Sequence, residues 1–191
     1  GIAVVDTVLY RQIDVPKLID KPGGQPGEKI EDPNINYIEI EGARIGEGFI
    51  DRLQQVLAFT KDDTAAAKFA KLSQWLEPVG TTTTDDETVA LFASFLLIPS
   101  PDNHPPLQYS PQKQKEKTLL ALVTWLHKAA EQQPVRLEIE DLHWADPSTL
   151  ELLRLLIDQA PRSRMLLLLK FRPEFTSPWP AQAHTLQMYL N

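Results

Sequence analysis

The sequence predicts an α/β fold in which parallel strands carry a helical insertion. Toward the carboxyl end it has the pattern strand, helix, strand, over residues 135–142, 147–159 and 164–171. A helix that crosses between two strands of one sheet makes those strands parallel, with a right-handed connection. The run MLLLLKF at 165–171 is almost wholly apolar, which suits a strand buried in a parallel sheet.

Composition excludes several classes of function. With 191 residues and 42% hydrophobic content, the chain can bury the core of one main domain. Its net charge of −7 argues against nucleic-acid and anionic-membrane partners, which normally need a basic face. No apolar run approaches the ~20 residues that span a bilayer. The absence of cysteine excludes thiolate chemistry and fits a reducing compartment, so we expect a cytoplasmic protein.

The amino-terminal part has two strand candidates separated by a linker. Residues 2–10 are rich in β-branched side chains, 20–33 combine prolines, glycines and charges, and 35–42 partly alternate. We therefore expect residues 1–34 to form an unassigned strand plus linker, and 35–191 to form the main domain. The chain starts without methionine and ends on a strand-like segment, which predicts a piece of a longer protein.

Three helices are expected in the middle of the chain. Apolar residues recur at helical spacing over 49–59. The segment 64–79 is rich in helix formers, and 85–99 has acidic residues in its first turn and ends at a proline. These helices make up the predicted insertion.

A proline-rich loop and a long helix follow. Prolines throughout 99–111 deny backbone donors, which predicts an ordered surface loop. Ser110 as the N-cap and Pro111 at the first turn predict the start of a helix that continues to about residue 131. Its apolar stripe consists of Leu119, Leu122, Val123, Leu126 and Ala130.

The strand–helix–strand pattern includes a capped helix and an unusual strand. Asp146 before Pro147 predicts an N-cap. The apolar stripe of this helix consists of Leu150, Leu153, Leu156 and Ile157. The preceding strand alternates, with Arg136 and Glu138 on one face, which predicts that a sheet neighbour or a covering helix is missing.

Two adjacent carboxylates, Glu140 and Asp141, end this strand. The carboxyl ends of parallel strands form the edge where α/β sheets bind ligands. In a nucleotide-binding sheet the first acid would hold Mg²⁺, directly or through water, and the second would orient the attacking water. The alternative is simple capping chemistry at the approach to the next helix. His143 is expected to pack, because four scattered histidines do not form a metal site.

Several segments resemble one family. EDLHWADPSTLELLRLLIDQAP at 140–161, RMLLLLKFRPEFTSPWP at 164–180 and the helix region from Tyr109 resemble the P-loop ATPase module of the STAND branch of the AAA-related NTPases. Bacterial multidomain proteins carry this module behind class III adenylyl or guanylyl cyclase domains. The resemblance is specific over 104–191, weaker back to about residue 50, and absent over 1–34.

This resemblance implies a fold, cofactors and partners. The fold is a partial P-loop NTPase three-layer sandwich with parallel strands and a helical insertion. The cofactors are Mg²⁺ and ATP, and the partners are attached or separate signalling domains of the cyclase or helical-repeat type.

The resemblance also assigns site residues. Glu140 and Asp141 match the acidic pair of the Walker B strand, with Glu140 as the Mg²⁺ ligand and Asp141 as the catalytic residue that orients the attacking water. Arg172 matches the arginine that senses the terminal phosphate; the alternative is a surface ion pair with Glu174. Trp144 matches the tryptophan after the acidic pair, although it can equally pack the turn.

The phosphate-binding loop G-x-x-x-x-G-K-[ST] is missing from the sequence. The nearest echo, Gly23–Lys29, has Glu28 before the lysine and Ile30 in place of the hydroxyl residue, and a carboxylate there would repel phosphate. A second echo at 42–48 lacks the lysine. Lys170 also replaces the small hydroxyl residue that this family usually has before the sensor arginine.

Three hypotheses follow. The first is an ATP-dependent signalling switch, of which this chain is a fragment or degenerate copy, inactive alone without its P-loop. The second is a non-catalytic interaction or structural module derived from such an ATPase. The third treats residues 1–34 as part of a different fold joined to the rest.

Overall fold

The computed structural model describes residues 3–8, 36–40, 45–76, 86–99 and 107–190. The predicted linker at 20–33, the boundary near residue 34 and the echo Gly23–Lys29 lie outside these residues. The protein is mixed α/β and divides into two compact units. Residues 1–46 and 129–191 form the sheet unit, and residues 47–128 form the helical unit.

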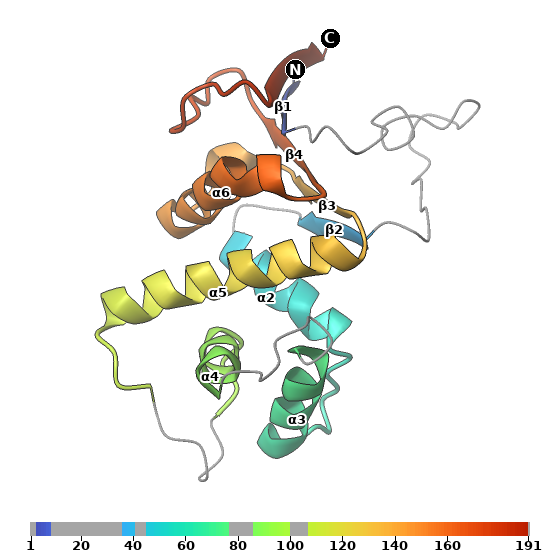
Figure 1. Cartoon of the computed structure of the whole chain (residues 1–191), viewed down its shortest axis with the longest axis vertical. Coiled ribbons are helices and arrows are strands. Elements are labelled where there is room, and N and C mark those ends of the chain that lie inside the picture. Colours follow the sequence, from blue (N-terminus) through green and yellow to red (C-terminus); the bar gives the residue numbers. More distant parts are fainter. Residues whose placement is uncertain (1–2, 9–35, 41–44, 77–85, 100–106, 191) are drawn as a thin grey trace, which may run out of the picture. The chain divides into compact units, whose positions relative to one another are not determined.

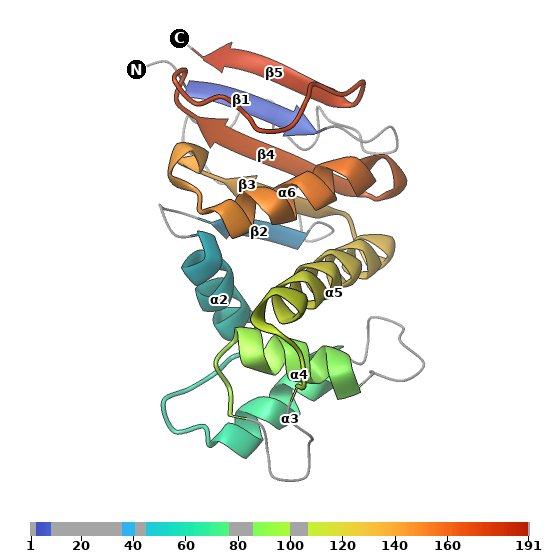
Figure 2. The ribbon, with the colours of Figure 1, turned by 90° about the vertical axis from the view of Figure 1, so that its left-hand side faces the viewer.

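Five strands form one sheet in the order β2-β3-β4-β1-β5 (Figure 2). Their bounds are Ala3–Val8 for β1, Asn36–Ile40 for β2, Val135–Ile139 for β3, Met165–Phe171 for β4 and Thr185–Leu190 for β5. Strands β2, β3 and β4 are parallel, which confirms the predicted parallel pair. Strand β1 lies beside β4 and runs antiparallel to both β4 and β5.

The sequence predicted that β3 lacks either a sheet neighbour or a covering helix, and the first of these alternatives is wrong. Strand β3 pairs with β2 on one side and β4 on the other, so that Leu137 lies opposite both Ile38 and Leu167. Val135, Leu137 and Ile139 are buried, whereas Arg136 and Glu138 are half-buried on the opposite face. The alternation therefore reflects charged side chains on one face of a central strand.

Helix α6 (Pro147–Gln159) connects β3 to β4 and lies along these strands (Figures 1 and 2). It begins as predicted: Asp146 Oδ1 accepts hydrogen bonds from the backbone N–H groups of Ser148 (2.8 Å) and Thr149 (3.2 Å). Within the predicted stripe, Leu150 is only half-buried. The buried face consists of Thr149, Leu152, Leu153, Leu156 and Ile157.

Asp146→Ala is expected to lower the free energy of unfolding by about 1 kcal/mol, because two backbone donors lose their acceptor. Asp146→Asn is the matched control, since its amide oxygen can accept the same bonds, and it should stay close to the parent. Urea denaturation followed by circular dichroism measures both variants. Equal losses in the two variants would contradict the capping role.

The helical unit contains most of α2 (Ile45–Val56), all of α3 (Ala65–Leu76) and α4 (Asp86–Phe95), and most of α5 (Pro111–Gln132). These confirm the predicted helices, although α2 starts and ends earlier than the predicted 49–59. Helix α4 ends at Phe95, before the predicted stop at Pro99, because the backbone of Leu97 is left-handed (φ 56°). Trp75 of α3 stacks on Trp125 of α5 with ring centroids 4.4 Å apart, and Phe92 of α4 meets Trp75 edge-on. All five residues of the predicted α5 stripe are buried. Ser110 caps α5 as predicted, through its Oγ and the backbone N–H of Lys113.

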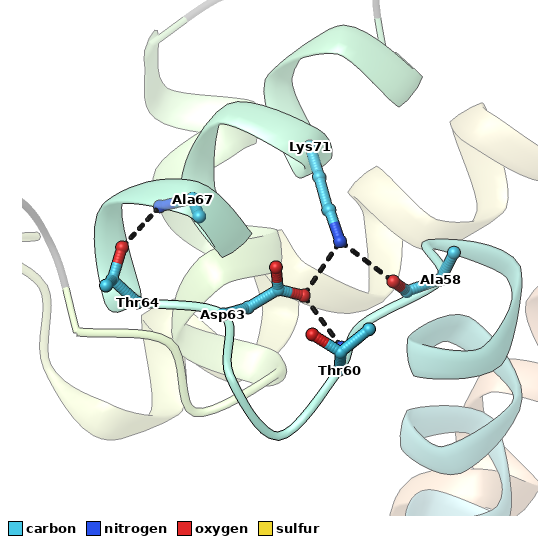
Figure 3. A network of polar contacts seen from close by, with 6 residues as sticks. All are labelled: Ala58, Thr60, Asp63, Thr64, Ala67 and Lys71. Carbon is cyan, nitrogen blue, oxygen red and sulfur yellow. Dashed lines mark hydrogen bonds and ion pairs between the residues drawn. The ribbon is translucent and has the colours of Figure 1, made fainter.

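A polar network closes the turn between α2 and α3 (Figure 3). Lys71 Nζ donates to Asp63 Oδ2 (2.8 Å) and to the carbonyl oxygen of Ala58 (2.9 Å), while the same Asp63 oxygen accepts from the backbone N–H of Thr60. The hydrogen bond from Lys71 is the main cause that lowers the pKa of Asp63. These bonds join the turn to Lys71 of α3, which indicates a structural role.

Candidate functional site

The two predicted acids follow β3 directly, at the edge where β3 and β4 both end. Strand β3 ends at Ile139, earlier than the predicted residue 142. The reason is Asp141, whose backbone is left-handed (φ 51°, ψ 39°) and therefore cannot continue a strand. Leu142–Trp144 then form a short 3₁₀ helix, η2, which contacts β4.

Lys170 of β4 holds Glu140 and a second carboxylate, Glu138. Its Nζ lies 2.5 Å from Glu138 Oε1 and 2.5 Å from Glu140 Oε1. Glu138 also pairs with Arg136, whose guanidinium nitrogen lies 2.7 Å from Glu138 Oε2. We call Arg136, Glu138, Lys170 and Glu140 the charge cluster; its signs alternate, and both anions are paired.

Burial makes the charge cluster more than a set of surface ion pairs. The side chains of Arg136 and Glu138 are only 19% and 14% exposed. Burial alone would raise the pKa of Glu138, but the hydrogen bond from Lys170 and the charge of Arg136 outweigh it, so the pKa lies below its ordinary value. Burial likewise opposes the charge of Lys170, yet its bonds to Glu138 and Glu140 raise its pKa. The cluster therefore favours its charged form.

Asp141, the predicted catalytic residue, is separate from the charge cluster. Its side chain is 61% exposed and does not cap η2. The nearest ionisable partner that the structure gives it is His143, whose Nδ1 lies 3.9 Å from Asp141 Oδ1, too far for a hydrogen bond. Asp141 thus faces solvent, where nothing in the described chain fixes its carboxylate.

His143 and Trp144 differ in exposure. The His143 side chain is 12% exposed, and its ring nitrogens make no hydrogen bond with a described residue, consistent with the predicted packing role. Trp144 is 59% exposed and touches the His143 ring at a tilt of 44°. Trp144 does not bury itself in the turn, which disfavours packing as its main role. Among the described residues, no group of three or more His, Cys, Asp or Glu could hold a metal ion.

Arg172, the predicted sensor, follows β4 directly and is exposed. Its backbone carbonyl accepts a hydrogen bond from the N–H of Phe175. In the part of the chain that the structure describes, Arg172 makes no ion pair, so the alternative pairing with Glu174 is not found there. The structure places Glu140, Asp141 and Arg172 at one sheet edge without direct bonds among them.

Sequence reasoning missed the Lys170 contacts. The sequence indicated that Glu138 lies on the polar face of its strand and that Lys170 replaces a small hydroxyl residue before Arg172. It did not predict that Lys170 and Glu138 form an ion pair. Part of the signal was available, because Glu138 and Glu140 lie two residues apart and so share one face. The register that places Glu138 opposite Leu168, two residues before Lys170, comes only from the structure.

Comparison with known proteins identifies no relative. No family model, curated protein or solved structure matches the chain. Within the described residues, no helix has the length and apolar character that crossing a bilayer requires.

Proposed function

We propose that this chain is a fragment or degenerate copy of an ATP-dependent signalling switch domain of the STAND type. In this proposal it no longer turns over nucleotide and acts as a non-catalytic interaction module toward attached or partner signalling domains. The observation that carries the proposal is the ion pair between Lys170 Nζ and Glu140 Oε1. Glu140 is the carboxylate that would hold Mg²⁺ in the family.

A fixed ammonium at this carboxylate disfavours a metal–nucleotide complex. Mg²⁺ requires near-octahedral oxygen ligands at about 2.0–2.1 Å. At Glu140 it would have to displace a cation that is bonded to two carboxylates at once. The residues therefore fit Mg²⁺ and ATP poorly.

The direction of β1 also supports the loss of nucleotide binding. A phosphate-binding loop follows the carboxyl end of a strand and leads into a helix whose N-terminus faces the phosphates. Strand β1 occupies the position beside β4 but is antiparallel, with Val4 opposite Phe171 and Val8 opposite Leu167. Its amino end thus lies toward the edge that carries Glu140, and its last residue, Val8, lies toward the opposite edge.

The finer fold assignment belongs to the same proposal. We infer a partial P-loop three-layer sandwich, supported by the parallel β3–β4 pair and its crossover helix α6. The helical unit would then be the insertion. Asp141 and Arg172 would occupy the positions of catalytic residues, while Arg172 and the exposed Trp144 suit protein contacts, in which Arg and Trp often dominate the binding energy.

Phosphate release from MgATP tests the proposal. We expect the chain to release phosphate no faster than buffer, and Glu140→Gln and Arg172→Ala to give the same result. Turnover above buffer that disappears in both variants would contradict it, because such turnover needs the acid and the sensor in working positions.

A further inference from the structure

We infer that the outer edge of β5 pairs with β5 of a second copy of this chain, antiparallel, so that the two sheets join into one. The inference goes beyond the proposed function and does not depend on it. It rests on the place of β5 in the sheet, on the absence of charge along this strand, and on the net charge of the chain.

Strand β5 lies at one end of the sheet and pairs, among the described strands, only with β1 (Figure 2). The register runs without a bulge from Thr185 opposite Val8 to Leu190 opposite Ala3. Within the described part of the chain, the other edge of β5 therefore presents unpaired backbone N–H and C=O groups. Such a row of groups is a template for a further strand.

The β5 segment lacks the features that usually protect a sheet edge. Natural edge strands carry lysines, prolines or bulges, or are very short. Strand β5, TLQMYL, has six residues and none of these side chains, and Leu186 is 47% exposed. Charged residues make up 24% of the chain, yet none of Asp, Glu, Lys or Arg occurs over residues 175–191. Strand β2, at the other end of the sheet order, is shorter and contains Glu39.

The charge of the chain favours β5 of a second copy as the added strand. Each copy has a net charge of −7, so two copies repel except where the surfaces that meet are uncharged. Pairing of β5 with β5 opposes only uncharged residues. Pairing of β5 with β2 of another copy would bring in Glu39 and would leave a β5 edge open for the next copy.

Symmetry identifies the position at which a charge would act against this pairing. Two antiparallel strands joined into one sheet by a two-fold axis are centred on one residue of each strand. A pair centred on Gln187 places the two glutamines directly opposite each other, and a pair centred on Met188 places them diagonally across the same face. Position 187 of one copy therefore lies close to position 187 of the other.

The contact is small. Backbone hydrogen bonds supply most of the affinity when one strand is added to a sheet edge. Six residues from each copy bury less than the roughly 1,200–2,000 Å² typical of stable interfaces, so we expect a weak dimer that forms as the protein concentration rises.

Sedimentation velocity at increasing protein concentration tests the inference. The weight-average mass of the parent chain should rise from the 21.6 kDa of one chain toward about twice that value and stop there, because the pairing uses the free β5 edge of both copies. A mass that stays at that of one chain up to about 1 mM overturns the inference. So does a mass that grows past two copies.

Gln187→Lys is the variant that should block the pairing. It places two like charges near each other across the two-fold axis, whereas within one chain the new lysine is opposite Asp6 of β1, a favourable combination. We expect a fold unchanged by circular dichroism and a dimer weakened at least about tenfold. Gln74→Lys is the matched control, because it adds the same charge at an exposed glutamine of α3, and it should dimerise as the parent does.

Two further measurements identify the contact. An equimolar mixture of Gln187→Lys and Gln187→Glu should restore the dimer, because opposite charges then meet across the axis. In the parent, exchange of the β5 backbone amides with deuterium should slow as concentration rises, which tests the contact even if Gln187→Lys does not fold. Dimerisation unaffected by Gln187→Lys overturns the inference, and so does β5 exchange that is independent of concentration.

Discussion

Leu126→Ala is expected to lower the free energy of unfolding by about 2–5 kcal/mol. Leu126 is the centre of the α5 stripe and is fully buried. Its truncation removes apolar contacts and leaves a cavity that the surrounding helices can fill only in part. Urea denaturation monitored by circular dichroism at the helix band measures the loss.

Leu120→Ala on the same helix is the matched control. Leu120 is 45% exposed, so the same chemical change should cost less than about 1 kcal/mol. Similar losses at both positions would mean that the buried face of α5 has been assigned wrongly. Because both substitutions change leucine to alanine in one helix, helix propensity cancels in the comparison.

Lys170→Met is expected to be the most destabilising change at the candidate site, by roughly 1–3 kcal/mol near neutral pH. It leaves two partly buried carboxylates side by side without their shared cation. The estimate is below that for a fully buried pair, because Lys170 and Glu140 are each more than a third accessible to solvent and are partly screened. Lys113→Met is the control, because Lys113 pairs with Glu116 on the exposed face of α5, and it should change stability little.

The stabilisation by this cluster should depend on pH in a predictable direction. The folded pKa of Glu138 is lowered, so its contribution is present above the unfolded pKa of about 4.5 and is lost as pH falls through the folded pKa. The folded pKa of Lys170 is raised, so its contribution is present below the unfolded pKa of about 10.5 and is lost as pH rises through the folded pKa.

The difference in unfolding free energy between the parent and Lys170→Met isolates the cluster. It should be largest between about pH 5 and 10 and should shrink on both sides. Taking the difference cancels the contributions of Asp63, Glu87 and Asp146 to the free energy of unfolding. Their folded pKa values are lowered, so their stabilisation is also lost in acid. The difference also cancels the contributions of Lys117 and Tyr109, whose folded pKa values are raised and whose stabilisation is lost in alkali. A difference that does not vary with pH would contradict the ion pairs of Lys170.

Elements defined by local signals could be predicted from the sequence. The α5 stripe follows from helical spacing, and the start of α6 follows from Asp146 and Pro147, because capping depends on neighbours in the chain. The parallel β3–β4 pair followed from the helix between them. Strand pairing between distant segments could not be predicted. Examples are the position of β2 beside β3 and the antiparallel position of β1 beside β4, because both depend on contacts between segments far apart in the sequence.

The candidate site was predicted in position but not in bonding. Glu140, Asp141 and Arg172 lie at the expected sheet edge, because residues that follow parallel strands share that edge. The role of Lys170 depends on the register between β3 and β4, which periodicity does not specify. The end of β3 was also missed, because the left-handed backbone of Asp141 has only a weak sequence signal in a residue other than glycine.

The central claim is that the acidic edge no longer binds nucleotide, and thermal unfolding with and without millimolar MgATP tests it most directly. A ligand at about 100 times its dissociation constant would add ~2.7 kcal/mol of stability. We predict no shift of the melting temperature for the parent, Glu140→Gln or Arg172→Ala. An upward shift in the parent that is lost in both variants would contradict the account and would mean that the chain contains an unrecognised phosphate-binding segment.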